Sequence, residues 1–595
     1  MDSSVSKDVL RSSRLSVALA VFLTVLPAVI VFLWHASRYG SWLIDDAGIT
    51  YAYARNLAAG YGLVSQPGQA AVEGFSNPLW TLLTALLYFL KLFSIPFTPK
   101  VLAFCLVVAS FVVFAMSVRQ LIPAVDAGAV AGCALVLTAA NPGFVIWCVS
   151  GLENPLLVLL AAFLLLMAAR ALREEAGSQF GISLCAGLLS AALALTRPDG
   201  LIYAIFFPLA LLLRTGSDEP GVVAKSLGVY GISMALPFGA YLLFRHIYFG
   251  EWVPNTYYAK PGVSIAAIFD LANLNGVGAA KFAELAAGIF GPLPFLVPTA
   301  LFAVLACLVL ARHREMVPRL LLLGGFAALA FIAYLVLPPD WMGEYRFASV
   351  AFPASYLLGF LLVREVLVAA QRPSARTATL ALAGAVALVT ASTGFLERAM
   401  VFRDHPTVPL EQVGQEAWKV NQLAAQLSLR DPTLLLPDLG GTLLLGKQRI
   451  VDVAGLCDRA IARFYHDGKP PVEFARYILH EVKPDLVHIH GYWARRSGLL
   501  QSQEFLAAYI NVDDGYYVRR ASLPRGMADA QARLIRSRLR DESVEADVRS
   551  ALAKRGAELD NSAGVRTSSA TPRAGDVGCA RAEHCGIRLR RASHA

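Results

Sequence analysis

The chain has 595 residues, of which 56% are hydrophobic and only 16% are charged. Soluble globular proteins are typically about 45–50% apolar and about 25% charged, so this composition excludes an ordinary soluble domain. The 52 basic and 43 acidic residues give a net charge of +9. In so hydrophobic a chain, a basic excess usually reflects cytoplasmic loops, and it does not indicate a nucleic-acid-binding surface. The eight cysteines show neither a disulfide framework nor a zinc pattern.

Apolar runs dominate the first two thirds of the chain, and many are long enough to cross about 30 Å of hydrocarbon as a helix. They fall near residues 15–34, 78–95, 101–118, 127–148, 154–169, 181–196, 200–213, 226–243, 292–311, 320–337, 347–363 and 377–396. The first run is long for a signal peptide, so we expect an uncleaved helix with its N-terminus in the cytoplasm. Residues 1–396 are therefore predicted to form an all-α polytopic membrane domain of about 11–13 transmembrane helices.

Two counts of the crossings disagree. The basic loop 311–319 and the segment with Arg364, Arg372 and Arg376 are expected in the cytoplasm, which puts the loop 246–291 outside. Counting from the N-terminus, with one crossing for each run, puts that loop inside. The helix-breaking triplet at 141–143 (NPG) removes the conflict if the run 127–148 forms two short crossings.

The composition changes after about residue 396. Short alternating strands and polar helices predict a small extracytoplasmic α/β domain over residues 397–520. His488 and His490 would share one face of a strand there, although two histidines alone rarely form a metal site. Residues 521–595 are rich in Arg, Ala and Ser without a hydrophobic period, so we expect a disordered basic tail.

With this topology, polar motifs gather at the extracytoplasmic ends of the helices, where an ionisable cluster is a functional-site hypothesis by default. The first is the pair Asp45 and Asp46. Both acids could merely end the first helix and cap the next. Alternatively, one carboxylate is a general base and the other orients it or holds a cation. Adjacent residues outside a helix point apart, which suits two roles better than one shared proton.

The other motifs leave similar alternatives open. Glu73 is either a surface charge or a second acid near the site, and Arg197 either snorkels towards water or binds a phosphate. The aromatic loop 248–260 is either an interfacial belt or a sugar-binding surface. Asp340 and Arg346 could form only a structural ion pair.

The segment 44–83 (IDDAGITYAYARNLAAGYGLVSQPGQAAVEGFSNPLWTLL) resembles the first external loop of the GT-C membrane glycosyltransferases. More narrowly, it resembles the branch that contains the terminal β-arabinofuranosyltransferase of mycobacterial cell walls and related bacterial membrane proteins. The motifs GLENPL, TRPDG, GEWVPNTYYAK, DWMGEYRF and VDVAGLCDRAIAR follow in the order expected for that branch. The similarity spans roughly residues 35–490.

This resemblance implies an inverting transferase that moves a sugar, such as arabinofuranose or another pentose, from a polyprenyl-phosphate donor to an envelope glycan, lipid or protein. It implies that Asp45 and Asp46 are the catalytic acids, and it leaves open which is the base and whether a divalent cation takes part. The leaving phosphate needs cationic help. The residues that the resemblance places at the donor phosphate or sugar are Arg55, Glu73, Arg197, Asp199, Asn255, Lys260, Asp340, Trp341 and Arg346. Gly48 departs from the family, which has an aromatic or similar residue there, and we expect looser packing beneath the site.

Two rival readings remain. Transporters and flippases tend to show inverted repeats and ionisable residues near the bilayer midplane, whereas the acids here lie at one interface. A non-catalytic scaffold of the same fold, acting in envelope assembly or motility, would show the same motifs. The expected location is the bacterial cytoplasmic membrane in either case, with membrane lipids and an envelope acceptor as partners.

Overall fold

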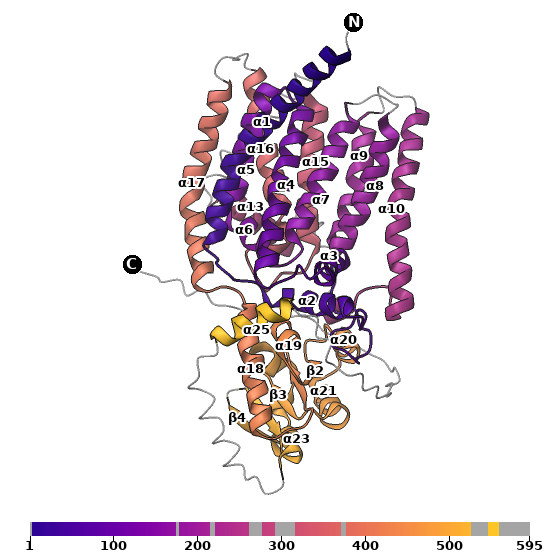
Figure 1. The fold of residues 1–595 in the computed structure, drawn as a ribbon, viewed down its shortest axis with the longest axis vertical. Coiled ribbons are helices and arrows are strands. Elements are labelled where there is room, and N and C mark those ends of the chain that lie inside the picture. The colour runs from indigo at the N-terminus through magenta and orange to yellow at the C-terminus, as the bar shows by residue number, and fades with distance from the viewer. Residues whose placement is uncertain are drawn as a thin grey trace.

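The computed structural model shows a bundle of long helices above a smaller α/β domain, with short helices between them (Figure 1). It describes residues 3–173, 178–214, 220–260, 276–291, 316–369, 376–513, 515–524 and 545–557. Within these ranges, seven helices are long and apolar enough to cross a membrane. They are α1 (Ser3–Ser37, apolar from Leu15), α4 (Phe97–Leu121), α7 (Asn154–Ala171), α8 (Gln179–Thr196), α10 (Pro220–Phe249), α15 (Val317–Val336) and α16 (Ala351–Ala369). The predicted polytopic helical domain is confirmed.

Further helices complete the bundle. They are α5 (Ala124–Ala140), α6 (Pro142–Cys148), η2 (Pro198–Ile205), α9 (Phe206–Leu212), α11 (Asn255–Ala259), α13 (Val277–Phe290) and α17 (Arg376–Asp404). Large apolar side chains on the outer helices are exposed, among them Phe22 of α1 at 57% and Val389 of α17 at 69%. A bilayer would cover these side chains, and the backbone polar groups are already paired within each helix. The predicted run at 292–311 lies outside the described residues.

Helix α3 (Pro78–Phe89) does not cross the membrane, although its run is apolar. It has 12 residues, whereas a crossing needs about 20. Both of its ends lie near α2 (Asp45–Ala58): Asn77 hydrogen-bonds Thr50, and Tyr88 stacks on Phe93, whose ring meets Tyr51. The chain therefore returns to the face from which it came.

The start of α4 confirms this return. Lys100, in the first turn of α4, donates hydrogen bonds to the carbonyl oxygens of Trp42 (2.6 Å) and Val149 (2.9 Å). Trp42 follows the end of α1, so α1 ends and α4 begins on the same face. The run 78–95 is consequently not a crossing, contrary to the sequence-based count.

The run 127–148 forms one crossing and not two, so that prediction is wrong. Near the start of α5, Asp126 pairs with Arg364 (2.9 Å). This pair lies at the far end of the bundle, opposite the near end at which α2 lies. Asn141 then accepts a hydrogen bond from the Gly143 amide, and the chain turns by 73° into α6. Trp147 of α6 donates to the Glu344 carbonyl at the near end (2.9 Å). The two crossing counts now agree, because leaving α3 out changes the number of crossings before the loop 246–291 by one. An additional crossing at 127–148 is not needed.

The small α/β domain is confirmed. Its sheet has the order β2-β1-β3-β5-β4, in which β1 pairs in parallel with β2 and β3, and β5 runs antiparallel between β3 and β4. The strands are β1 (Thr433–Leu436), β2 (Arg449–Asp452), β3 (Leu486–His488), β4 (Tyr509–Asp513) and β5 (Tyr516–Arg519). The main helices are α18 (Leu410–Gln426), α19 (Gly440–Leu445), α20 (Arg459–His466), α21 (Pro471–Tyr477), α22 (Gly491–Arg496) and α23 (Gln503–Ala508).

The predicted disordered tail contains a helix, α25 (Glu545–Ala557). Val548 is fully buried and Leu552 is 5% exposed, because α25 packs against α18 and α19. The prediction of disorder is therefore wrong for this segment. Residues 525–544 and 558–595 lie outside the described part of the chain.

Two glycines allow α2 and α19 to approach each other closely. A Cβ atom on Gly440 would lie 1.8 Å from the Asp45 carbonyl oxygen, and one on Gly48 would lie 2.7 Å from the Gly440 backbone. Such distances leave no room for a side chain. The expectation that Gly48 loosens the packing is wrong, because the glycine brings the two domains together.

We expect Gly440→Ala to push α19 away from α2 and to lower the thermal midpoint of the purified protein. Forcing a methyl group into a filled space typically costs about 1–3 kcal/mol. Gly239→Ala on α10 is the matched control, since a Cβ there meets nothing within 4 Å. Equal midpoints for the two variants would contradict the close approach.

The return of α3 can be tested by accessibility in sealed vesicles. Single cysteines replacing the exposed residues Ala70 and Lys91, in a cysteine-free background, flank α3. Because α3 does not cross, we expect a membrane-impermeant maleimide to label both positions from the same side. Labelling from opposite sides would show that α3 spans the membrane.

Candidate functional site

Asp45, at the start of α2, connects the helical domain to the C-terminal domain. Its buried carboxylate accepts hydrogen bonds from the backbone amides of Gly440 (2.9 Å) and Gly441 (2.8 Å), the first two residues of α19. Burial raises the pKa of the Asp45 carboxyl well above its usual range, the Asp438 carboxylate adds to the rise, and the two amide hydrogen bonds oppose it. Both carboxylate oxygens accept a hydrogen bond and the residue is only 5% exposed, so Asp45 is poorly accessible to a substrate.

Arg55 completes the contact at the other end of the same helix. Its guanidinium donates to the carbonyl oxygens of Leu443 (3.2 Å) and Leu444 (3.3 Å), near the end of α19. An anion at the start of a helix and a cation at its end are both favourable to the helix dipole. Along α2, Arg55 lies about 14 Å from Asp46, at 1.5 Å per residue. The structure thus places Arg55 against the C-terminal domain.

Asp46 points away from α19 and towards two cations. Its carboxylate lies 4.0 Å from Lys260 Nζ and 3.7 Å from an Arg346 Nη1 atom, and its side chain is 25% exposed. Arg346 also pairs with Asp340, through Nε and Oδ2 at 3.2 Å. Four of the predicted residues, from α2, from the end of α11 and from the loop between α15 and α16, therefore meet at the domain boundary.

A second ion cluster lies beside the first. Arg197, at the end of α8, pairs with Glu153 (3.1 Å) and with its neighbour Asp199 (2.9 Å). The guanidinium carbons of Arg197 and Arg346 each lie 4.7 Å from the centre of the Phe347 ring. Two carboxylates neutralise Arg197, which leaves Arg346 and Lys260 as the cations nearest Asp46 in the described chain.

Three predicted residues lie elsewhere. Glu73 is buried and pairs with Arg245 of α10 (2.6 Å), so it ties the loop after α2 to a membrane helix. The side-chain amide of Asn255 donates to the Gly455 carbonyl (2.8 Å) and to other carbonyls of that loop, which joins α11 to the C-terminal domain. Trp341 is 59% exposed beside Asp340.

Glu153 was expected among the polar motifs at the extracytoplasmic helix ends but was given no role in binding or catalysis, and Phe347 was not expected at the site. Glu153 lies in the GLENPL motif, and its carboxylate also accepts a hydrogen bond from Asn77 (2.7 Å). Phe347 directly follows Arg346, and its ring contacts both guanidinium groups. The spacing of the motifs carried no signal for either contact, because each one joins segments that are distant in the chain.

The rings of His488 and His490 lie 5.0 Å apart, and each has a further partner. The His488 ring stacks on Tyr516, with centroids 4.0 Å apart and planes within 6°. His490 Nε2 lies 2.8 Å from Asp438 Oδ2. Among the described residues, no three His, Cys, Asp or Glu side chains gather in a way that could hold a metal ion.

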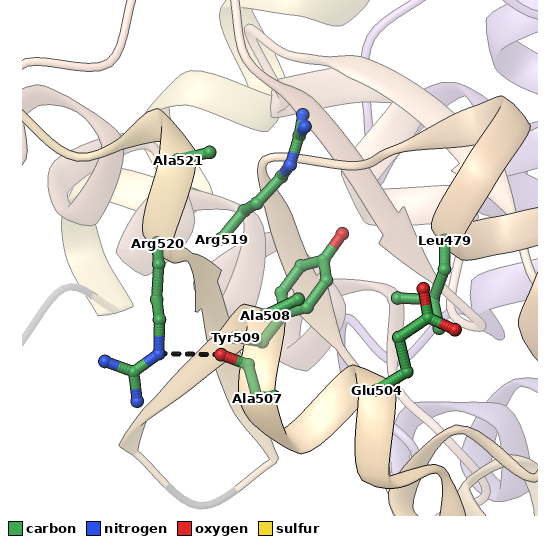
Figure 2. A pocket seen from close by; sticks show the side chains of 8 residues that line it. All are labelled: Leu479, Glu504, Ala507, Ala508, Tyr509, Arg519, Arg520 and Ala521. Atoms are coloured by element: carbon green, nitrogen blue, oxygen red, sulfur yellow. Dashed lines mark hydrogen bonds between the residues drawn. The ribbon is translucent and has the colours of Figure 1, made fainter.

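A hollow of about 310 Å³ lies at another edge of the C-terminal domain (Figure 2). Its lining comes from residues on and around α23, β4 and β5: Leu479, Glu504, Ala507, Ala508, Tyr509, Arg519, Arg520 and Ala521. Arg520 crosses one side of it and donates to the Ala507 carbonyl (2.9 Å). None of these residues belongs to α2 or to the ion clusters, so this hollow is separate from the Asp46 cluster.

Acid should destabilise the protein through His488. Burial lowers the pKa of His488 from 6.5 to about 4, so the folded state keeps the ring neutral. The contribution of the neutral His488 ring to the free energy of unfolding is therefore complete above pH 6.5, and it is lost as the pH falls from 6.5 towards 4. Proton linkage gives a loss of about 2 kcal/mol at pH 5. His488→Phe retains an aromatic ring that can stack on Tyr516. We expect the thermal midpoint of this variant to depend less on pH between pH 7.5 and 5 than that of the wild type. The exposed His480→Gln is the control, and an unchanged slope in His488→Phe would contradict this assignment.

No protein-family model and no curated protein matches the chain. Solved structures do match. ArnT from Cupriavidus metallidurans in the apo state aligns with a TM-score of 0.53 at 16% identity, covering 84% of this chain and 98% of that one. The same enzyme bound to undecaprenyl phosphate also aligns at 0.53 and 16% identity, covering 84% of this chain and 97% of that one.

The archaeal oligosaccharyltransferase AglB from Archaeoglobus fulgidus, in complex with an inhibitory peptide and a dolichol-phosphate, aligns with a TM-score of 0.50 at 11% identity, over 85% of this chain and 75% of that one. At these identities the likeness is one of fold. It confirms the predicted GT-C type architecture. The narrower resemblance to the arabinofuranosyltransferase branch stays a prediction.

Proposed function

We propose that the chain is an integral-membrane glycosyltransferase that takes a sugar from a polyprenyl-phosphate donor and passes it to a hydroxyl group of an envelope acceptor. One observation carries this proposal. An accessible carboxylate, Asp46, lies between two cations, Lys260 and Arg346, at the boundary between the helical bundle and the C-terminal domain.

The arrangement suits an inverting displacement. The acceptor oxygen attacks the anomeric carbon while Asp46 takes the proton of that hydroxyl. The bond between the anomeric carbon and the phosphate oxygen breaks, and the lipid phosphate leaves with the bonding electron pair. Arg346 and Lys260 stabilise the negative charge that develops on the phosphate. No covalent intermediate on the protein is required.

Asp46, and not Asp45, is the base in this proposal. Both oxygens of Asp45 accept backbone amide hydrogen bonds, and its side chain is buried. Asp46 is 25% exposed, and its contacts with the two cations are long, at 3.7 and 4.0 Å. A carboxylate held in this loose way can turn towards an acceptor hydroxyl, whereas Asp45 would first have to break the domain contact.

The location suits a lipid-linked donor, whose chain lies in the bilayer and whose sugar lies in water. Structures of similar fold contain undecaprenyl phosphate or a dolichol-phosphate, which supports this donor class. The sequence resemblance favours arabinofuranose or another pentose as the sugar. Arg364 and Arg376, which pair with Asp126, lie at the end of the bundle opposite Asp46. The positive-inside rule would place that end in the cytoplasm and the site on the outer face.

Asp46→Asn should strongly reduce turnover without unfolding the protein. Loss of a general base typically costs about 10²–10⁴-fold in rate, and we expect a loss in that range, with the thermal midpoint unchanged. The measurement is the consumption of each donor in a panel of polyprenyl-phosphate sugars by purified protein with envelope acceptors. Glu504→Gln, an exposed acid of the C-terminal domain, is the control.

The two adjacent acids are distinguishable in this assay. Asp45→Asn should lower the thermal midpoint, because one amide of α19 loses its acceptor, whereas Asp46→Asn should not. Wild-type turnover in Asp46→Asn would remove Asp46 from the mechanism. If folded wild-type protein consumes no donor of a broad panel, the transferase proposal fails and a scaffold of the same fold becomes the better explanation.

A further inference from the structure

The tail helix α25 is docked onto the C-terminal domain close to the bundle (Figure 1). Val548 and Leu552 form its buried face, with exposed fractions of 0% and 5%. An ion pair adds to this contact, between Arg549 Nε and a carboxylate oxygen of Glu411 on α18 (2.6 Å). Burial of two apolar side chains and a formed ion pair indicate a specific docking site for this helix.

Helices α25, α18 and α19 pack directly against one another. A Cβ atom on Gly414 of α18 would lie 3.1 Å from Val548 and 3.2 Å from Leu445 of α19. A Cβ atom on Gly441 would lie 2.4 Å from the Gly414 amide nitrogen. The three helices α25, α18 and α19 are therefore in direct contact. Because the space between them is filled, a movement of α25 would also move α18 and α19.

On its other side, α19 meets the helix that carries Asp46. The amides of Gly440 and Gly441 hold the Asp45 carboxylate, and the Gly440 backbone lies against Gly48. Helix α19 has only six residues, too few to be stable in isolation. Its position therefore depends on the layers that pack against its two sides, α2 on one and α18 with α25 on the other.

We propose that α25 is a positioning element for Asp46. The tail helix holds α18 and α19 in place, α19 holds Asp45 through its two amides, and Asp45 fixes the first turn of α2, where Asp46 faces Lys260 and Arg346. Helix α25 does not contact the substrate in this scheme. The catalytic part of this inference rests on the proposed transferase function, whereas the mechanical part does not.

Leu552→Asp in the full-length chain tests the inference, with Ser550→Asp on the exposed face of the same helix as the matched control. The first readout is hydrogen exchange of the Gly440 and Gly441 amides. A buried charge should detach α25, and we expect exchange to become about tenfold faster, as for a local opening. The control should leave exchange unchanged.

The second readout is donor kinetics. We expect kcat to fall about tenfold while the donor KM stays within about twofold, since the base on α2 is displaced whereas the two cations lie on other segments, directly after α11 and between α15 and α16. A general loss of folded protein would instead lower the active fraction without changing the kcat of the remaining molecules, which active-site-normalised kinetics reveal.

The outcomes separate the two proposals. Unchanged exchange at Gly440 and Gly441 in folded Leu552→Asp would overturn the positioning role, as would faster exchange with unchanged kcat. If wild-type protein has no transferase activity, the proposed function fails, and exchange alone decides whether α25 controls α19. If Leu552→Asp does not reach the membrane as folded protein, Val548→Ala provides the same comparison. A chain that ends after residue 557, and so retains α25, should behave as wild type in both readouts.

Discussion

The hydrogen bonds between the Asp45 carboxylate and the first two amides of α19 are the contact on which the rest of the site depends. A buried carboxylate without partners would be costly, and removing one partner of such a bond typically costs about 1–3 kcal/mol. Here the start of a helix supplies both donors, and the helix dipole favours the negative charge. The contact joins the C-terminal domain to α2, and it withdraws one of two adjacent acids from the solvent. It thereby leaves Asp46 as the acid that faces the cations.

The charges around Asp46 differ in how firmly they are held. Arg197 is buried between two carboxylates at 2.9 and 3.1 Å, so its charge is largely neutralised by the protein. Lys260 and Arg346 lie farther from Asp46, at 4.0 and 3.7 Å, and the Lys260 side chain is 43% exposed. The exposed Lys260 ammonium is therefore available to an anionic group from outside, whereas Arg346, whose side chain is 11% exposed, also pairs with Asp340 at 3.2 Å. The domain boundary at which these cations lie is also where a lipid-linked phosphate would lie.

Much of the architecture was predictable because hydrophobicity has a direct structural consequence. A run of about 20 apolar residues can be satisfied only as a helix in lipid or in a core, so most crossings were located correctly. The errors at 78–95 and 127–148 share one cause. An apolar segment can be buried in lipid or in a protein core. Its hydrophobicity alone does not tell whether the helix crosses the membrane or returns to the same side. Only the contacts of Tyr88 and Trp147 at the near face decided that question.

The sequence by itself determined the membrane domain and the separate α/β domain, and it drew attention to the acidic pair at the start of α2. It could not assign their roles, because Asp45 and Asp46 are neighbours with identical side chains, and their difference comes from a partner 395 residues away. The expectation for Gly48 was wrong for the same reason, since the α19 backbone that it meets lies in another domain. The contact of Arg55 with that backbone was equally unpredictable from the sequence. The tail helix was missed because its apolar face becomes recognisable only against the groove of α18 and α19 that covers it. Local propensity and hydrophobic runs act within a few turns of the chain, whereas the roles of these charges were decided by long-range packing.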